Sequence, residues 1–340
     1  MSDHPDGRTV TAGLAATAVG AATAATAGPR LLAGSPIAAE IRAGLIADFA
    51  AFKEQWGYVP SLAVVLVGAD APSAVYLQQI LRTCERVGVQ GRLVEIGSDV
   101  TADALCNEIE RLNADPAVAG IIVQMPLPAH IPLRTVIDSI DPAKDIDGIH
   151  PRNAGLLSLG YDGFLPATAQ ASVEILKRSG IEIAGKRVVV VGRSNVVGKP
   201  AALLLLREHG TVSILHSRTR DLGHYTRDAE ILVVAAGKAG LVTGEMLSPG
   251  VVVVDVGINV VPDGRGAERL VGDVDFESAR DVVGAITPVP GGVGPLTNAL
   301  LLTHLLRAAT DQAERTGRGV GTTAAAKGAK GAKGAKGAAR

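Results

Sequence analysis

The sequence predicts an α/β protein with two domains, each built on a parallel sheet that helices cover. Three observations support this fold class. The chain has 340 residues, a length that favours two domains of ordinary size. Hydrophobic residues make up 47% and aromatic residues 3%, so Val, Leu, Ile and Ala must fill the core, as they do in buried parallel strands. Apolar runs also alternate with segments of helical spacing, which is the pattern of β-α-β crossovers.

The first domain is expected to begin with a helix and then alternate strands and helices. Apolar residues recur at every third or fourth position over 36–53, which predicts a helix. The uncharged run LAVVLV at 62–67 predicts a strand buried on both faces. The remaining expected elements are a helix over 73–87, a strand over 93–96, a helix from the Thr101 N-cap to about residue 112, and a strand over 120–123.

A second series of elements begins after Gly185. The expected strands are 187–191, 211–215, 231–235 and 251–254. A helix is expected over 198–208, with Pro200 in its first turn, where a missing N–H costs least. A last helix over 297–308 follows a Pro/Gly-rich turn, and its return to the first domain would make that domain discontinuous.

A glycine-rich turn joins the first strand and helix of this second series. Four valines at 188–191 run directly into Gly192-Arg-Ser-Asn-Val-Val-Gly198. Glycine at a strand end lets backbone N–H groups approach a phosphate, and the following helix directs its positive N-terminus toward that phosphate. The spacing differs from the common Gly-x-Gly-x-x-Gly pattern. A tight structural turn is the alternative, but Arg193 and Ser194 add groups that bind anions.

The end of the following strand predicts which dinucleotide binds. An acidic residue there would hold a ribose 2′-hydroxyl and favour NAD. The stretch 216–220 reads His-Ser-Arg-Thr-Arg and has no acid before Asp221, so the sequence favours the 2′-phosphate of NADP. Arg218 and Arg220 individually also fit a basic solvated loop.

Charge and cysteine content exclude several other classes of protein. The last fourteen residues carry five of the 33 Lys and Arg, so the rest of the chain holds 28 against 34 Asp and Glu, a poor balance for a nucleic-acid surface. Cys84 and Cys106 form no CxxC and no metal spacing, so a reduced cytoplasmic protein without a metal site is expected. The uncharged stretch 11–29 is too rich in Ala, Thr and Gly to span a membrane.

Several strings in the chain are more specific than these patterns. They are Val191-Gly-Arg-Ser-Asn-Val-Val-Gly-Lys-Pro200, His216-Ser-Arg-Thr219, Gly272-Asp-Val-Asp275, Ile286-Thr-Pro-Val-Pro-Gly-Gly-Val-Gly-Pro295, Gln124-Met-Pro-Leu-Pro128 and Lys144-Asp-Ile-Asp-Gly148. Together they resemble the methylenetetrahydrofolate dehydrogenase/methenyltetrahydrofolate cyclohydrolase family. The resemblance covers about residues 31–309.

The resemblance implies how the chain divides and what it does. It implies a folate-binding catalytic domain over 31–163, completed by a C-terminal helix over 296–309, and a Rossmann-type NADP-binding domain over 164–295. Residues 1–30 and 315–340 are expected to be disordered extensions. Members are usually homodimers that oxidise 5,10-methylenetetrahydrofolate with NADP in one-carbon metabolism. Many then hydrolyse the methenyl product to 10-formyltetrahydrofolate.

The resemblance also implies site residues. Asp147 matches the aspartate that binds the pterin, and a carboxylate can accept two parallel N–H bonds from that ring. Tyr76 matches the tyrosine whose ring lies against the folate, and Gln124 follows a strand end, where parallel sheets place ligand contacts. Without the resemblance, a turn aspartate, a core aromatic and a loop amide fit equally well. The residues expected to contact the cofactor are Gly192, Arg193, Ser194, Ser217 and Ile258, and those expected to shape the folate site are Pro288 and Gly292.

Two strings depart from the family pattern. Pro166-Ala-Thr-Ala169 stands where the family usually has Pro-Cys-Thr-Pro, and Ala33-Gly34-Ser35 where it has Asp-Gly-Lys. The first change is expected to alter packing near the cofactor.

The largest departure is at Ile80. In the family, the helix after the first strand reads Tyr-x-x-x-Lys-x-x-x-Cys, and that lysine is held essential for the cyclohydrolase step. Here Tyr76 and Cys84 match, and Ile80 stands at the lysine position. The spacing places the three residues along one helix face, so Ile80 is expected to point where the lysine would. An isoleucine cannot transfer a proton, so the sequence predicts retained dehydrogenase and lost or severely reduced cyclohydrolase activity.

Neighbouring polar residues offer the alternative that both activities survive. Arg82 lies about 200° from Ile80 around a helix and is not expected to substitute for the lysine. Gln79 or Ser35 would have to compensate instead.

Two further functions compete with the dehydrogenase. One is a regulatory homologue that binds folate or NADP without catalysis, against which the intact motifs argue. The other is weak polyanion binding through the Ala-Lys-Gly repeats at 326–337, although a solvated disordered tail is the simpler interpretation.

Overall fold

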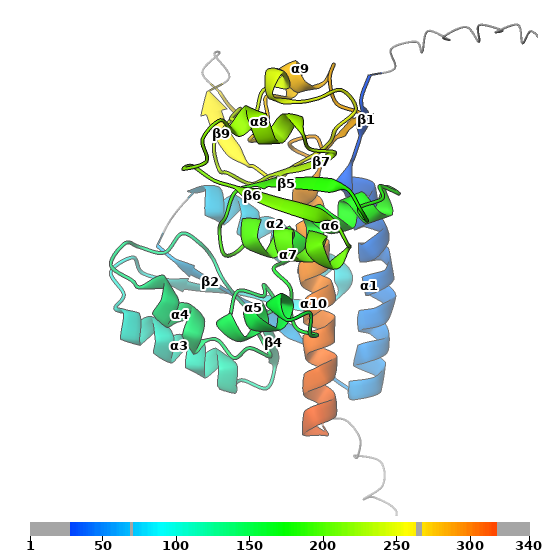
Figure 1. Ribbon diagram of the computed structural model, residues 1–340. Coiled ribbons are helices and arrows are strands. Elements are labelled where there is room, and N and C mark those ends of the chain that lie inside the picture. Colours follow the sequence, from blue (N-terminus) through cyan, green and yellow to red (C-terminus); the bar gives the residue numbers. More distant parts are fainter. Residues whose placement is uncertain (1–27, 69–70, 263–266, 318–340) are drawn as a thin grey trace, which may run out of the picture.

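The computed structural model describes residues 28–68, 71–262 and 267–317. Two parallel sheets, each covered by helices, lie one above the other in Figure 1. The structure therefore confirms the predicted α/β fold class with parallel sheets.

The smaller sheet belongs to the first part of the chain. Its strands are ordered β3-β2-β4, and both neighbouring pairs are parallel. The strands are β2 (Ser61–Val67), β3 (Gln90–Ile96) and β4 (Val118–Val123). Every residue of β2 and β4 is buried, as the uninterrupted apolar runs predict.

Five of the described helices belong to this part of the chain. They are α1 (Gly34–Trp56), α2 (Ala71–Val87), α3 (Ala102–Ala114), α4 (Leu133–Ser139) and α5 (Pro151–Ser158). Thr101 caps α3 as predicted, because its Oγ1 accepts a hydrogen bond of 3.2 Å from the N–H of Ala104.

The larger described sheet has the order β1-β11-β8-β7-β5-β6, and all its pairs are parallel. Its strands are β1 (Arg30–Leu31), β5 (Arg187–Val191), β6 (Thr211–Leu215), β7 (Ile231–Val234), β8 (Val252–Asp255) and β11 (Ala285–Ile286). Its helices are α6 (Ala167–Arg178), α7 (Gly198–Arg207), α8 (Leu222–Arg227), η1 (Gly244–Met246) and α9 (Phe276–Ala279). A separate antiparallel pair consists of β9 (Asn259–Pro262) and β10 (Glu268–Val271).

The last helix, α10 (Val293–Thr316), lies alongside α1, as Figure 1 shows in orange and blue. Its first turns bury Leu296 and Leu300 in the core of the larger sheet, and its later turns bury Leu301 and Leu305 in the core that contains β2. Each fully buried leucine contributes about 1.5–3 kcal/mol relative to an exposed one. α10 therefore connects the two cores.

The start of the chain differs from the sequence-based expectation. Arg30 and Leu31 pair in parallel with Ala285 and Ile286, so they form an edge strand of the larger sheet. The sequence assigned residue 30 to a disordered extension and residue 31 to the first domain. Two residues are too short for a periodic signal, and the pairing depends on a strand about 250 residues away. At the other end, residues 315 and 316, predicted to belong to a disordered tail, form the last residues of a helix that ends at Thr316. The rest of the two predicted extensions, 1–27 and 318–340 with the Ala-Lys-Gly repeats, lies outside the described residues.

The described residues also bear on membrane insertion, metal binding and cysteine chemistry. None of their helices is both long enough and apolar enough to cross a bilayer. Within the same ranges, no group of three or more His, Cys, Asp or Glu side chains is arranged to hold a metal ion. Cys84 and Cys106 are free thiols, and burial raises the pKa of Cys84 to about 12.

Candidate active site between two cavities

The glycine-rich turn between β5 and α7 is fixed by close backbone contacts. Gly192 has a φ of 132°, and a Cβ there would collide with the carbonyl of Ala235 on the neighbouring strand. A Cβ at Gly198 would collide with the carbonyl of Gly192. The Oγ of Ser194 accepts hydrogen bonds from the N–H groups of Val197 (3.1 Å) and Gly198 (3.2 Å), so this hydroxyl supports the start of α7.

The turn opens into a cavity of about 500 Å³, here called the turn cavity. Its lining residues include four that the sequence singled out: Gly192, Arg193, Ser194 and Ser217. Lys238, which sequence reasoning missed, also lines it. Among the described lining residues there is no Asp or Glu, so the cavity offers basic groups and hydroxyls to an anion.

The Gly272–Asp275 motif holds the loop after β7, which lines part of the turn cavity. The carboxylate of Asp273 accepts hydrogen bonds from the N–H groups of Ala236 (2.6 Å), Gly237 (2.8 Å) and Lys238 (2.8 Å). Asp255 in turn accepts a bond of 2.9 Å from the N–H of Asp273. These aspartates hold the loop after β7 in place, so the motif is structural in this fold.

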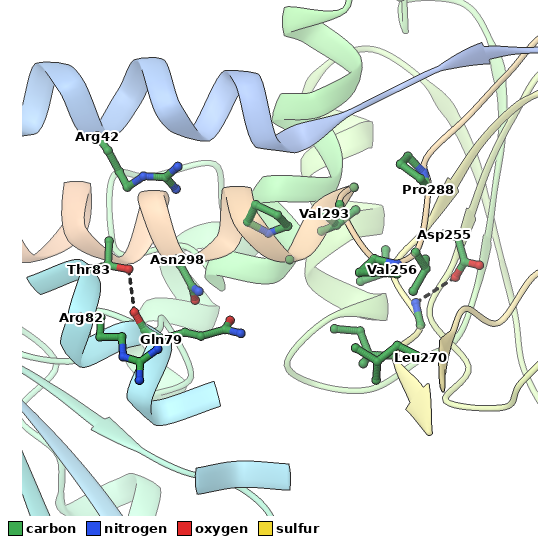
Figure 2. Close-up of a pocket in the computed structure, with 18 of the residues that line it drawn as sticks. Arg42, Gln79, Arg82, Thr83, Asp255, Val256, Leu270, Pro288, Val293 and Asn298 are labelled. Carbon is green, nitrogen blue, oxygen red and sulfur yellow. Dashed lines mark hydrogen bonds between the residues drawn. The ribbon is translucent and has the colours of Figure 1, made fainter. Parts of the chain in front are cut away.

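A second cavity of about 420 Å³, here called the interdomain cavity, lies between the helices of the first part of the chain and the loops of the larger sheet. In Figure 2, Arg42 of α1 and Gln79, Arg82 and Thr83 of α2 lie at one end, and Asp255, Val256, Leu270 and Pro288 lie at the other. Asn298 of α10 lies at the same end as Arg42. The predicted residues Ile258, Pro288 and Gly292 all line this cavity.

The Pro/Gly-rich loop that borders the interdomain cavity is held against the start of α1. The N–H of Gly34 donates to the carbonyl of Gly291 at 2.9 Å, and a Cβ at Gly34 would collide with the carbonyl of Gly292. Glycine at position 34 is therefore required by this contact. The change from the family's Asp-Gly-Lys to Ala33-Gly34-Ser35 leaves that glycine in place.

Within the Lys144–Gly148 motif, the residues around Asp147 have structural roles. Lys144 Nζ donates to the carbonyls of Leu112, Asn113 and Asp115 at 2.6–3.2 Å. The buried carboxylate of Asp145 accepts from the N–H groups of Ile149 (3.1 Å) and His150 (2.8 Å) and from Nδ2 of Asn153 (2.7 Å).

Asp147 is half-buried, whereas the carboxylate of Asp145 in the same motif is fully buried. Burial and the nearby charge of Asp145 raise the pKa of Asp147 to about 7, although the N–H of Ala167 opposes the shift. A carboxyl with such a pKa, still partly open to solvent, is available to a ligand.

The loop carrying Asp147 is tied to α10 through the residue before it. His304 Nδ1 lies 2.7 Å from the carbonyl oxygen of Ile146, and its Nε2 lies 2.8 Å from Oε1 of Gln170. Burial lowers the pKa of His304 to about 4, and since the Ile146 carbonyl can only accept, the proton of the neutral ring is on Nδ1 and Nε2 is an acceptor facing the Gln170 amide. This contact fixes the backbone immediately beside Asp147.

The structure does not bring all the predicted site residues into one cavity. Gln124 is half-buried after β4, and its Nε2 donates to the carbonyl of Met125 at 2.9 Å. Neither Gln124 nor Asp147 lines the turn cavity or the interdomain cavity. Tyr76 lies on α2, but its side chain is outside the described residues.

Ile80 lies in the core of the first part of the chain. Ile80 is 2% exposed and packs in the apolar core with Leu45, Leu77 and Ile146, so it does not point into an open site. The residues of α2 that line the interdomain cavity are Gln79, Arg82, Thr83 and Arg86. Arg82 lies about 200° from Ile80 around the helix, so it faces this cavity while Ile80 faces the core.

Comparisons with known proteins match both parts of this structure. Residues 32–147 match the family model described as the catalytic domain of tetrahydrofolate dehydrogenase/cyclohydrolase, and residues 166–313 match the NAD(P)-binding domain of the same family. The chain belongs to the tetrahydrofolate dehydrogenase/cyclohydrolase family. The family predicted from the motifs is thereby confirmed, as is a domain of the NAD(P)-binding type.

Relatives of this family cover most of the chain. It is 46% identical over 285 residues to the "Bifunctional protein FolD" of Brevibacillus brevis, covering 84% of this chain and 99% of the relative. Among solved structures, the bifunctional FolD enzyme of Campylobacter jejuni has a TM-score of 0.80 and 41% identity, covering 83% of this chain and 99% of that one. The Trypanosoma brucei enzyme, solved with NADP and an inhibitor, has a TM-score of 0.81 and 38% identity, covering 86% and 99%.

Proposed function

We propose that this protein oxidises 5,10-methylenetetrahydrofolate to the 5,10-methenyl form with NADP as hydride acceptor. The observation that carries the proposal is the family match across both parts of the chain. The turn cavity supports it, because Arg193 and Lys238 line it without a carboxylate. The regulatory, non-catalytic alternative has no comparable support.

The test of this function is direct. Purified protein, NADP and methylenetetrahydrofolate should produce NADPH, followed by its absorbance. Absence of NADPH formation, with NADP binding retained, would favour the regulatory homologue instead.

The proposed roles of the site residues follow from the needs of hydride transfer. When bound, NADP supplies the hydride acceptor, so the protein must hold the methylene carbon against it and keep water out. Asp147 would accept hydrogen bonds from the pterin, while Tyr76 and Gln124 would position the folate. Pro288 and Gly292 border the interdomain cavity and would shape the folate side.

Selectivity for NADP is expected to depend on Arg193. Arg193 and Ser217 line the turn cavity and would contact the 2′-phosphate, with Gly192 and Ser194 at the turn beneath it. A charge-assisted hydrogen bond contributes about 1.5–3 kcal/mol, so Arg193→Ala should weaken NADP binding about ten- to a hundredfold and barely change NAD binding. Fluorescence titration with both dinucleotides measures this.

Arg220→Ala is the matched control, because Arg220 is exposed but does not line the turn cavity. Equal weakening of NADP and NAD in Arg193→Ala would show that the 2′-phosphate lies elsewhere.

We also propose that the cyclohydrolase activity is lost or severely reduced. The proposal rests on Ile80, which stands at the position of the family lysine and carries no group able to transfer a proton. The relatives are named as bifunctional proteins. Those names do not support a loss of cyclohydrolase activity and favour a fully bifunctional enzyme. Hydrolysis of methenyltetrahydrofolate by the purified wild type, measured against the spontaneous rate, decides between the two.

A homodimer is proposed through the free edge of the larger sheet. β6 pairs with β5 on one side in the described sheet, and Ile214 on β6 is 44% exposed. Nearby Leu206 is 58% exposed and Tyr225 43%. An unpaired edge beside apolar side chains favours pairing with a second copy. Sedimentation should show a dimer that Ile214→Lys weakens, and a wild-type monomer at micromolar concentration would contradict it.

A further inference from the structure

A buried histidine that lines neither cavity joins three segments that meet beside Asp147. His304 lies on α10 and is 7% exposed. Its Nδ1 lies 2.7 Å from the carbonyl oxygen of Ile146, and its Nε2 lies 2.8 Å from the terminal amide of Gln170 on α6. Since the part of the chain that matches the catalytic domain ends at Asp147 and α6 opens the NAD(P)-binding part, His304 links the end of one to the start of the other.

The two ring nitrogens of His304 have different roles. The carbonyl of Ile146 can only accept, so Nδ1 carries the proton of the neutral ring. Nε2 is then an acceptor, and the amide of Gln170 satisfies it by turning its NH2 group toward the ring. Phe164 packs edge-on against the imidazole with ring centroids 5.7 Å apart, and the guanidinium of Arg307 covers Phe164 at 5.1 Å from its centroid. These contacts hold the imidazole in one orientation.

The hydrogen bond to Ile146 acts on Asp147 through the peptide unit that the two residues share. The carbonyl of Ile146 and the nitrogen of Asp147 lie in one plane, so holding the oxygen fixes the plane from which Asp147 projects. On the other side, the N–H of Gly148 donates to the carbonyl of Asp145 at 3.1 Å. Both peptide units that flank Asp147 are therefore held.

The orientation of this peptide matters for the carboxyl of Asp147. That carboxyl faces the N–H of Ala167 at the start of α6, and its other lone pairs are open to a ligand. A carboxylate that accepts two parallel N–H bonds from a pterin must lie in the plane of that ring. A misplacement of about 1 Å in such a site can cost about 10²-fold in rate.

We propose that His304 is a positioning residue for the dehydrogenase: its Nδ1–H holds the Ile146–Asp147 peptide so that the Asp147 carboxylate meets the pterin in the orientation that hydride transfer requires. This role rests on the proposed function. Gln170 supports it from α6, because its amide keeps Nε2 an acceptor and so keeps the proton on Nδ1.

Two matched variants separate positioning from stability, since a buried carbonyl needs a donor for stability as well. In His304→Asn, Nδ2 is bonded to Cγ, as Nδ1 of histidine is, so it can still donate to Ile146. In His304→Gln, the amide nitrogen is bonded to Cδ and extends toward Gln170 instead. Each variant places one amide in the same core, so both should lower the unfolding temperature by similar amounts.

Their kinetics should differ. The value of kcat/KM for methylenetetrahydrofolate should stay within about threefold of wild type in His304→Asn and fall about tenfold or more in His304→Gln. KM for NADP should be unchanged in both. Thr303→Ala, which changes the exposed neighbour of His304 on α10, should keep wild-type kinetics.

The outcomes separate this role from the proposed function. Equal kcat/KM values in the two amide variants would overturn the positioning role while the dehydrogenase stands. If wild type forms no NADPH, the dehydrogenase fails, and calorimetric titration of folic acid then decides the role of His304. Weaker binding to His304→Gln than to His304→Asn would support it, and equal affinity would overturn it.

A measurement on wild type applies even if both variants fail to fold. In NMR spectra of protein with isotope-labelled histidine, His304 should appear as a neutral imidazole with its proton on Nδ1. The rings of His150 and His216 differ, because their Nδ1 atoms accept backbone N–H groups. The Nδ1–H signal of His304 should shift when folic acid is added. A missing signal of this kind, or one that folic acid leaves unchanged, would overturn the positioning role.

Discussion

Asp147→Ala is expected to abolish turnover while the fold and NADP binding stay near normal. Asp147 is half-buried, and its neighbours Asp145 and Lys144 already hold the loop, so removing its carboxylate should not unfold the site. Loss of two charge-assisted bonds to the pterin should lower kcat/KM for the folate by about 10²- to 10⁴-fold. Steady-state kinetics together with NADP titration measures both effects.

The pH dependence of the same residue adds a second test. The pKa of Asp147 is raised to about 7, so the carboxylate becomes protonated as the pH falls below this value. The protonated group loses an acceptor for the pterin, so kcat/KM for the folate should fall below about pH 7. Asp147→Asn should remove that inflection and leave a low, flat profile.

Asp99→Ala, which removes an exposed aspartate elsewhere, is the control for nonspecific effects. Ordinary activity in Asp147→Ala would place the pterin at another site.

The turn cavity illustrates what a sequence can predict. Gly192 and Gly198 are required by contacts within one strand–turn–helix unit and the adjacent strand, so a short string carries the information. Arg193 and Ser217 follow from their positions after two strand ends, and the structure brings them together in the turn cavity. Because parallel strands end at one edge of a sheet, such residues converge whatever the rest of the fold does.

The interdomain cavity illustrates what a sequence cannot predict. Arg42 and Arg86 come from the consecutive helices α1 and α2, whereas Asn298 comes from α10 near the other end of the chain, and the three residues meet through packing of these helices. No local pattern predicts that meeting. The burial of Ile80 is a similar case, because it depends on how α2 is rotated against a core that also contains Leu45 and Ile146.

Ile80→Lys is expected to raise the cyclohydrolase activity, which we propose is lost or severely reduced in the wild type. A general acid–base group contributes about 10²- to 10⁴-fold, so wild type should hydrolyse methenyltetrahydrofolate near the spontaneous rate and the variant clearly above it. Ile80 is 2% exposed, so a lysine there must extend its four-carbon stem out of the core to keep its ammonium group solvated. The variant should therefore also unfold at a lower temperature, since an ammonium that stays in the core is costly.

Two controls isolate the charge. Ile80→Met keeps an apolar side chain of similar volume in the same core and should leave hydrolysis at the wild-type level. Leu77→Lys places the same charge three residues earlier in the core of α2 and tests whether any buried lysine on this helix has the effect. Decay of methenyltetrahydrofolate absorbance measures hydrolysis in each variant.

Since wild type is assayed in the same series, the proposed loss of cyclohydrolase activity stays testable even if both lysine variants fail to fold. Hydrolysis by wild type well above the spontaneous rate would mean that Gln79, Ser35 or the cavity-facing Arg82 does what the family assigns to lysine, and that the chain is fully bifunctional.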